Sequence, residues 1–408
     1  MNLGWWLAGL FAWVSGGPAW GFHALGLVAA AVFVSGAVRS LSAQGCSGTA
    51  RAWATALVLA GSGLGWMIAG RGDLLPDLHM GLFPSAQRLL GNAHALLASG
   101  LLVWALTLHG EWRAGTMPRW VWLLVAATLG LVRPFDLVLL VGSVVIRSTS
   151  RGRRAEMLQL TWLAPVVVYD ALAFGFHPAF STWSSSQNVV AVPGAGPLFL
   201  ALGPAASLAV AALRPRTGSG GEVQGAFLAA AGTGLLLLLS PLSFGFQFAS
   251  GLGALLLIPA APALGRALPF ASLALAPTSL LLLQQLALPP AHWFPPRDYA
   301  AAVAHLRAEC RPQDLALAPP NLSLMTAAGS PCRVAFGHRV LTPDYETRLA
   351  EVQTFYAETT TPAWRREYLR GLGVRFVVLP QGREQWLAGP NWRRVLSLPS
   401  LEIFAGRS

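Results

Sequence analysis

The sequence predicts a polytopic α-helical membrane bundle in residues 1–288 and a small α/β domain in residues 289–408. Two observations predict the bundle: residues 1–288 consist of apolar stretches separated by short arginine-bearing loops, and they hold only seven of the 17 acidic residues. Apolar stretches of this kind match the roughly 20 residues that cross a hydrocarbon core, where only helices satisfy their own backbone polar groups. A third observation predicts the smaller domain, because residues 289–408 have a mixed polar composition.

The first part contains ten apolar segments. They run approximately from 3 to 17, 20 to 38, 52 to 70, 93 to 109, 120 to 146, 158 to 176, 195 to 213, 223 to 240, 249 to 264 and 268 to 288. Segment 120–146 is either a single span or two short helices that turn back at Arg133, Pro134, Phe135 and Asp136. A single span would place the arginines that follow it opposite Arg113, against the tendency of basic loops to stay in the cytoplasm. We therefore expect the hairpin, and about eleven helices in all.

The positions of the arginines predict the orientation of the bundle. The formal net charge is +11, and every basic residue is arginine. With the hairpin, two arginines of the short loops, Arg71 and Arg88, lie on the outer side, and eleven lie on the cytoplasmic side: Arg39, Arg51, Arg113, Arg119, Arg147, Arg151, Arg153, Arg154, Arg214, Arg216 and Arg266. This bias reports orientation in a membrane rather than binding of nucleic acid. We expect a multi-pass protein of the cytoplasmic (inner) membrane whose C-terminal domain is extracytoplasmic.

The C-terminal domain alternates helical and strand patterns. Helices are expected at about 298–310, 344–357 and 363–372, and strands at 315–318, 333–336, 374–379, 392–398 and 401–404. This alternation predicts a small, mostly parallel sheet with helical cover. The domain has no glycine-rich phosphate loop, nucleophile elbow or zinc-spaced cysteine and histidine set, so we do not expect catalysis within it alone. Cys310 and Cys332 either form a disulfide in an oxidising compartment or remain two buried thiols.

Four local patterns on the expected outer side carry a resemblance to a known family. They are the loop Asp77 to Ser85 leading into Asn92, Ala93 and His94; the turn Arg133 to Asp136; the loop with Trp183, Gln187 and Asn188; and the stretch with Gly337, His338, Leu341, Thr342, Pro343 and Asp344. In this order they resemble the bacterial integral-membrane glycosyltransferases of the GT-C superfamily, including uncharacterised members that end in an α/β cap. The resemblance covers most of the chain from about residue 60 onward. It implies transfer of a sugar from a polyprenyl-phosphate donor in the lipid bilayer to a glycan or protein acceptor of the cell envelope.

This chemistry selects the first site candidates. Sugar transfer needs a carboxylate that deprotonates or orients the acceptor, and cationic or metal help for the departing phosphate. We expect Asp77 and Asp73 to be the catalytic acids, with His79 and Arg88 contacting the phosphate or a divalent cation. The alternatives are a solvated loop in which the aspartates cap helices, and an interfacial anchor for Arg88. His338 would bring a polar group from the C-terminal domain.

Further candidates for substrate binding are spread along the outer side. His94 begins a helix, and Asp170 falls near the outer end of its helix; a packing role is the alternative for each. Trp183 could stack on a sugar ring while Gln187 and Asn188 bind its hydroxyls. An interfacial aromatic anchor explains Trp183 equally well.

The chain departs from the family pattern near its start. The family places its principal acid in the first outer loop, and the corresponding turn here, about Gly16 to Ala19, holds no acid. This departure supports a second hypothesis, a non-catalytic membrane component with a degenerate GT-C fold that binds a partner of envelope assembly through its cap. A transporter is a third class, but the sequence shows no repeated halves with broken helices in corresponding positions.

Overall fold

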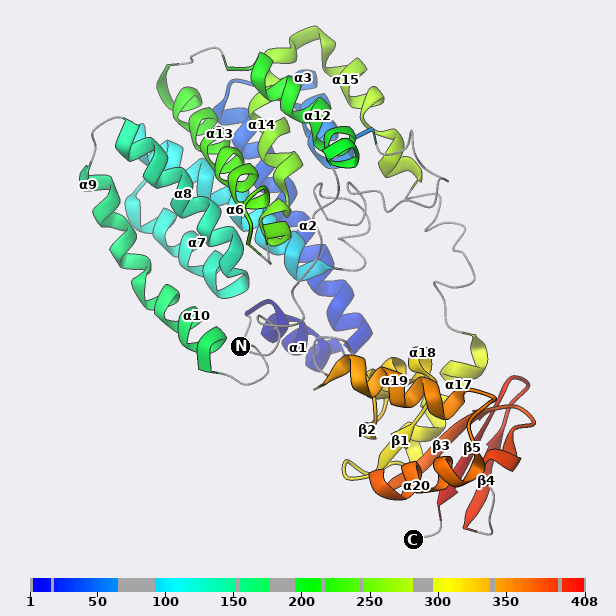
Figure 1. The fold of residues 1–408 in the computed structure, drawn as a ribbon. Coiled ribbons are helices and arrows are strands. Elements are labelled where there is room, and N and C mark those ends of the chain that lie inside the picture. Colours follow the sequence, from blue (N-terminus) through cyan, green and yellow to red (C-terminus); the bar gives the residue numbers. More distant parts are fainter. Residues whose placement is uncertain are drawn as a thin grey trace. The chain divides into compact units, whose positions relative to one another are not determined.

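The structure, a computed structural model, describes residues 3–15, 18–64, 92–150, 154–176, 195–213, 217–242, 245–281, 296–337, 342, 344–387 and 391–406. These residues form two compact units, a helical unit up to residue 281 and a C-terminal unit from residue 296 onward (Figure 1). The expected boundary at residues 288 and 289 lies outside the described ranges. Within those ranges, four stretches are long and apolar enough to cross a membrane: Trp20–Ala43, Ala93–Arg113, Gly218–Leu238 and Gly245–Leu281.

Each expected apolar segment contains a helix in its described part. The longer elements are α1 (Leu3–Ser15), α2 (Pro18–Ala43), α3 (Gly48–Ala60), α6 (Ala93–Arg113), α7 (Arg119–Val132), α8 (Pro134–Ser150), α10 (Ala164–Phe176), α12 (Ala195–Ala211), α13 (Gly218–Leu238), α14 (Leu252–Leu264) and α15 (Leu268–Ala274). Shorter elements are α9 (Arg154–Met157) and the 3₁₀ helices η2 (Leu158–Leu163), η4 (Gly245–Ala249) and η5 (Gly265–Ala267).

The ambiguous segment 120–146 is the expected hairpin. Helix α7 ends at Val132 and α8 begins at Pro134, with Arg133 in an extended conformation between them. The proline explains the break, because its ring disfavours a helical conformation in the residue before it. Trp122 near the start of α7 packs with Val144 near the end of α8, so the two helices are antiparallel.

Helices α2 and α6 run parallel. Phe33 lies beside Gly100, and six residues further along α2 Arg39 forms an ion pair with Glu111, with 2.7 Å between Arg39 Nη2 and Glu111 Oε2. Both helices therefore end on the same side of the helical unit. We call this side the arginine end, because it also holds Arg113 and the other arginines described next.

A buried ion network holds the arginine end together. Arg113 at the end of α6 lies 2.5 Å from Glu156 Oε2 and 3.0 Å from Glu222 Oε2, and Arg147 of α8 also pairs with Glu222. The Arg113 side chain is fully buried. Charges are tolerated inside a helical bundle when they are paired in this way. The network joins the ends of α6, α8, α9 and α13.

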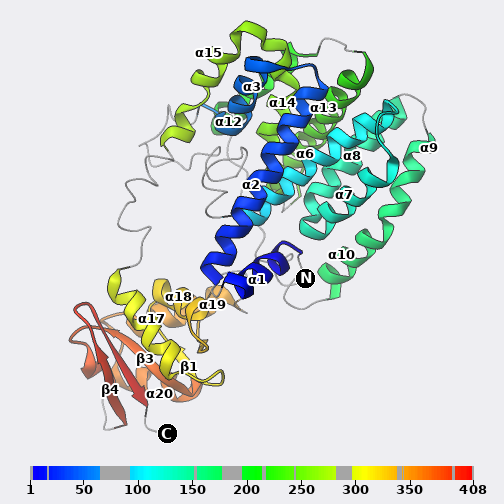
Figure 2. The ribbon, with the colours of Figure 1, turned by 180° about the vertical axis from the view of Figure 1, so that it is seen from behind.

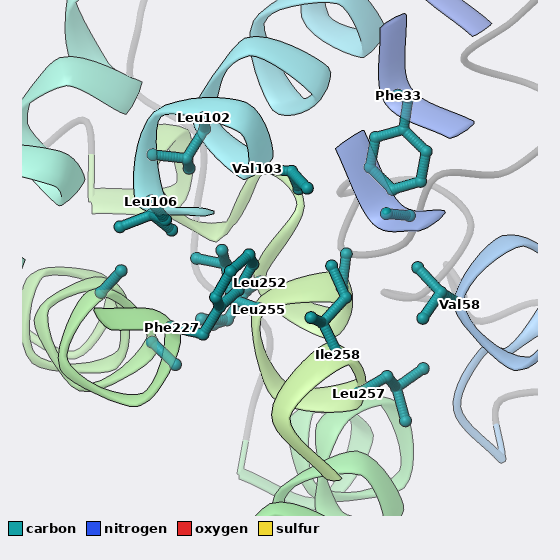
Figure 3. Packing of buried hydrophobic residues seen from close by; sticks show 14 of the residues in the cluster. Phe33, Val58, Leu102, Val103, Leu106, Phe227, Leu252, Leu255, Leu257 and Ile258 are labelled. Atoms are coloured by element: carbon teal, nitrogen blue, oxygen red, sulfur yellow. The ribbon is translucent and has the colours of Figure 1, made fainter. Parts of the chain in front are cut away.

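The core of the helical unit lies between α2, α3, α6, α13 and α14. Phe33, Val58, Leu106, Phe227 and Ile258 contribute buried side chains from these five helices, and they point toward one another in Figure 3. Within each of these helices the buried residues recur about every three to four positions, as expected for helices that pack through one face.

The C-terminal unit is a five-stranded sheet with helices on both faces (Figure 2). Its strands are β1 (Leu315–Leu317), β2 (Arg333–Val334), β3 (Val374–Pro380), β4 (Trp392–Ser397) and β5 (Leu401–Gly406), in the order β2-β1-β3-β5-β4. Helices α17 (Arg297–Glu309) and α18 (Pro320–Gly329) pack on one face, and α19 (Tyr345–Tyr356), α20 (Pro362–Leu372) and the 3₁₀ helix η7 (Glu384–Leu387) pack on the other.

The sheet differs from the expectation in two respects. Only β2, β1 and β3 are parallel, whereas β5 is antiparallel to β3 and β4 is antiparallel to β5. The expectation of a mostly parallel sheet was therefore too simple. Helix α18 was not expected, although its proline at the first helical position is a common way for a helix to begin.

A disulfide joins Cys310 and Cys332, which resolves the choice between a bridge and two thiols. Cys310 directly follows α17, and Cys332 directly precedes β2. The bridge therefore closes the β1-α18-β2 unit at the amino ends of its two strands. It fixes β2, which has only two residues and two pairing partners on β1, Leu315 and Ala316.

Candidate functional site at the Arg133 end

Arg133 is the centre of a polar cluster at the side of the helical unit opposite the arginine end. Its Nη1 lies 2.9 Å from Asp136 Oδ1, and its Nη2 donates to the backbone oxygen and to Oε1 of Gln247 at 2.9 and 2.8 Å. Asp136 is fully buried and Arg133 nearly so. We call this side the Arg133 end.

The local sequence explains how Arg133 and Asp136 meet. Pro134 starts α8, so Arg133 closes α7 while Asp136 falls in the first turn of α8. A carboxylate in that turn is favoured by the partial positive charge of the helix N-terminus. Phe135 between them stacks edge-on against Phe248, which brings η4 and therefore Gln247 to the turn.

Asp170 lies on the side of α10 that faces the bundle. Along α10, Val166, Asp170 and Ala173 are half-buried, while most of their neighbours are exposed. Val166 packs against Gly130 of α7, and Arg119 at the start of α7 bonds Gln159 in η2, so α7 and α10 run in the same direction.

This direction places Asp170 at the Arg133 end. Asp170 follows Val166 by one helical turn, just as Arg133 follows Gly130 by about one turn of α7. Its Oδ2 is buried and has no hydrogen-bond partner among the described residues. Inside a membrane such an acid would be costly, which makes Asp170 a candidate for function.

His94 also lies at the Arg133 end. It is half-buried in the first turn of α6. Ser99, further along α6, lies against Gly251 at the start of α14, and Gly251 follows Gln247 by four residues. The beginning of α6 is therefore on the same side as Gln247. The structure thus brings the predicted candidates His94 and Asp170 to one end of the helical unit.

The remaining predicted candidates lie outside the described residues. They are Asp73, Asp77, His79, Arg88, Trp183, Gln187, Asn188 and His338. Within the described ranges no group of three His, Cys, Asp or Glu side chains is arranged to hold a metal ion. The expected cluster of Asp73, Asp77 and His79 stays a prediction.

The buried network at the arginine end was missed in the sequence. Glu156, Glu222 and Arg147 are each separated from Arg113 by more than 30 positions, and no local motif links them. One signal was present, because acids are rare in residues 1–288 and each would need a partner inside a membrane. In the described part of the helical unit every acid except Asp170 forms an ion pair.

The C-terminal unit fills the position where open α/β sheets usually bind ligands. That position is the carboxyl edge of neighbouring strands whose connections leave in opposite directions, here β1 and β3. The hydroxyl of Tyr356 lies there, donating to the backbone oxygen of Val378 at 2.7 Å and lying 3.4 Å from that of Leu317. The hydroxyl of Tyr356 therefore occupies the backbone oxygens at this edge.

Comparison with models of protein families and with curated proteins finds no match to this chain. The chemistry open to the Arg133 end therefore has to follow from its residues. Arg133 is a guanidinium fixed by three acceptors, and Asp170 is a carboxyl with one buried oxygen unbonded within the described ranges. The first can stabilise negative charge and the second can accept a proton.

Proposed function

We propose that the chain is a multi-pass membrane glycosyltransferase of the GT-C type that transfers a sugar from a polyprenyl-phosphate donor to an envelope acceptor. The Arg133 end faces out of the cytoplasm and contains the reaction site. The observation that carries this proposal is the separation of polar groups: paired arginines close one end, while Arg133, Gln247, His94 and Asp170 gather at the other.

The exposed surface of the helical unit supports a position in the bilayer. Among the described residues, every exposed large apolar side chain except Leu324 belongs to this unit. Soluble monomers do not expose such extended apolar surface. Trp120 near the arginine end and Trp20 near the Arg133 end are both exposed, and tryptophan is enriched at the two interfaces of a membrane.

Two observations support the proposed orientation. Arg39, Arg113 and Arg147 share one end of the unit, and loops rich in arginine stay in the cytoplasm. The disulfide of Cys310 and Cys332 forms in oxidising compartments, so the C-terminal unit belongs outside the cytoplasm.

The roles of the residues follow from the reaction. Transfer proceeds by direct displacement at the anomeric carbon, in which the acceptor hydroxyl loses a proton and the polyprenyl phosphate leaves as an anion. Asp77 and Asp73 remain the proposed catalytic acids, and Asp170 at the Arg133 end adds a third carboxyl. His79 and Arg88 are proposed to bind the phosphate, with a divalent cation as an additional helper.

The test combines lipid identification with activity. Lipid extracted from the purified full-length protein is identified by mass spectrometry, and the protein in vesicles is assayed for release of polyprenyl phosphate from polyprenyl-phosphate sugars. We expect a bound polyprenyl-phosphate lipid, and a loss of turnover of at least ~100-fold in Asp77→Asn, Asp73→Asn or Asp170→Asn. The exposed Glu367→Gln serves as control. Absence of the lipid, together with unchanged cellular glycans in all three variants, would refute the proposal.

A non-catalytic component of envelope assembly is the second candidate. It is favoured by the turn from about Gly16 to Ala19, which lacks the acid that the family places there. In that case the protein would be required in cells, but Asp77→Asn, Asp73→Asn and Asp170→Asn would each support normal envelope glycans. Loss of the C-terminal unit alone would abolish its role.

A further inference from the structure

The helical path from Arg154 to Phe176 contains a long 3₁₀ segment. Helix α9 is followed without a break by the six residues of η2 and then by α10. Runs of 3₁₀ helix longer than three or four residues are uncommon, and within a longer helix they mark hinges or strain.

Pro165 explains the 3₁₀ segment. Proline has no backbone N–H, and in an α-helix its ring clashes with the carbonyl four residues earlier, here that of Thr161. The Thr161 carbonyl, which Pro165 cannot reach with an N–H, accepts from the N–H of Ala164, three residues later in the chain. This is the 3₁₀ pattern. The Thr161 hydroxyl in turn donates to the carbonyl of Leu158 at 2.6 Å.

The chain before η2 is firmly held. Glu156 belongs to the ion network of the arginine end, and it also accepts from Ser148 at 3.2 Å. Gln159 accepts from Arg119 at 2.9 Å, and Leu163 at the end of η2 is buried in the core. These contacts fix the base of α10.

Within the described ranges, α10 is half-buried on one side and exposed on the other. Val167, Val168 and Leu172 are about half exposed, and Phe176 at the end of α10 is 81% exposed. Among the described residues, α10 packs mainly against α7 and η2. By contrast, α8 is tied to α13 at the arginine end and its first turn is tied to η4 through Arg133.

We propose that α10 is a hinged arm that swings about η2 and moves Asp170 relative to the fixed polar cluster of Arg133 and Gln247. The stripe of Val166, Asp170 and Ala173 lies against the bundle in one position of the arm and separates from it in the other. The swing does not depend on sugar transfer; only its effect on Asp170 in the reaction rests on the proposed function.

Distances between spin labels test the swing without substrate. Cysteines replace Ile146 and Leu172 in one protein and Ile146 and Leu236 in the other, all exposed, in a Cys46→Ala background. The full-length protein in phosphatidylglycerol–phosphatidylcholine vesicles carries a nitroxide label on each introduced cysteine. The distribution of distances between the two labels is measured by double electron–electron resonance. The first pair spans the hinge, and the second joins α8 to α13, which the ion network ties together.

We expect the pair across the hinge to give a distribution at least twice as wide as the control pair. Pro165→Ala, which permits an unbroken α-helix, should narrow it to the width of the control and leave the control unchanged. Thr161→Ala, which removes the side-chain bond of η2, should narrow it in part and serves if Pro165→Ala does not fold. Equal widths in the unmodified hinge, or a broad distribution that persists in both variants, would overturn the proposal. Neither result bears on whether the protein binds a polyprenyl-phosphate lipid.

Discussion

Asp136 is buried in the first turn of α8, and its pairing with Arg133 sets the effect of its loss. Removing one partner of a buried ion pair leaves an uncompensated charge and costs about 3–5 kcal/mol, whereas removing both costs less. We expect Asp136→Ala to lower the free energy of unfolding by about 3 kcal/mol in detergent, and Arg133→Ala with Asp136→Ala by less than that.

Thermal unfolding of the purified protein measures this difference. The exposed Glu367→Ala is a suitable control, with an expected change within about 0.5 kcal/mol. If the double variant were destabilised by the sum of the two single variants, Arg133 and Asp136 would not be coupled.

Two tyrosines make the C-terminal unit sensitive to alkaline pH. Burial raises the pKa of Tyr356 well above its usual value, and burial together with Glu351 raises the pKa of Tyr368 to about 12. In the unfolded chain a tyrosine has a pKa of about 10, so below that pH both states keep the proton and the folded state is fully stable. Above about pH 10 the unfolded chain loses the proton more readily than the folded protein, and the free energy of unfolding falls as pH rises toward the raised folded pKa.

These two tyrosines should therefore add no pH dependence to the stability of this unit below about pH 10, and above that pH they should lower it by up to about 1.4 kcal/mol per pH unit for each tyrosine. Denaturant unfolding of the full chain, followed by hydrogen exchange in β1 and β3, measures the slope. Tyr356→Phe with Tyr368→Phe should flatten it. An unchanged slope in that double variant would show that other groups cause the alkaline loss.

At the scale of elements, local sequence predicted helices better than it predicted their partners. Apolar length indicated the segments, and Pro134 with its neighbours indicated the hairpin that α7 and α8 form. The direction of β5 could not be read locally, because it depends on which strand it pairs with. The turn before it did hold a signal, since the three residues between β4 and β5 are too few for a parallel crossover.

The candidate site was predictable in the same partial way. The placement of His94 and Asp170 at one end followed from the order of the helices, and the arginine pattern predicted that Arg39, Arg113 and Arg147 gather at the other end. The bonds of Arg133 to Gln247 and the ion network of Arg113 join residues far apart in the sequence. Such pairs depend on how the helices pack, which no local pattern contains.

Close packing of α6 against α13 depends on Gly110. A Cβ atom at this position would lie 2.7 Å from the Val223 Cα, whereas a Cβ at Gly232 of α13 would have no neighbour within 4 Å. Alanine favours a helix over glycine by about 1 kcal/mol, but overpacking an interface costs about 1–3 kcal/mol. We expect Gly110→Ala to lower the midpoint of thermal unfolding and Gly232→Ala to leave it unchanged or raise it. The same sign for both variants would contradict the packing argument.

The disulfide should stabilise the β1-α18-β2 unit selectively. Its cysteines are 22 residues apart, and a loop of this size corresponds to about 3 kcal/mol of stabilisation. We expect Cys310→Ser with Cys332→Ser to speed hydrogen exchange in β2 and α18 strongly, while the exchange of α6 stays the same. Cys46→Ser, which removes the third cysteine, is the matched control. Equal exchange in β2 with and without the bridge would show that the pairing with β1 suffices to hold the strand.

At the scale of the whole molecule, one position at the arginine end and one in the C-terminal unit make the proposed orientation testable. Ala114 is exposed beside the arginine end, and Leu324 is exposed on α18. We expect a cysteine at position 114 to react with a membrane-impermeant maleimide only in inside-out vesicles, and a cysteine at position 324 only in intact spheroplasts. Both proteins carry Cys46→Ala, and a reaction of both cysteines from one side would contradict the orientation.

The parallel arrangement of α2 and α6 limits how this chain can change in evolution. Arg39 meets Glu111 only because the chain returns to its starting side between the two helices. In the proposed membrane arrangement, a deletion or duplication that altered the number of crossings between residues 43 and 93 by one would invert α6 and every helix after it. Viable relatives should therefore gain or lose helices in this stretch only in pairs.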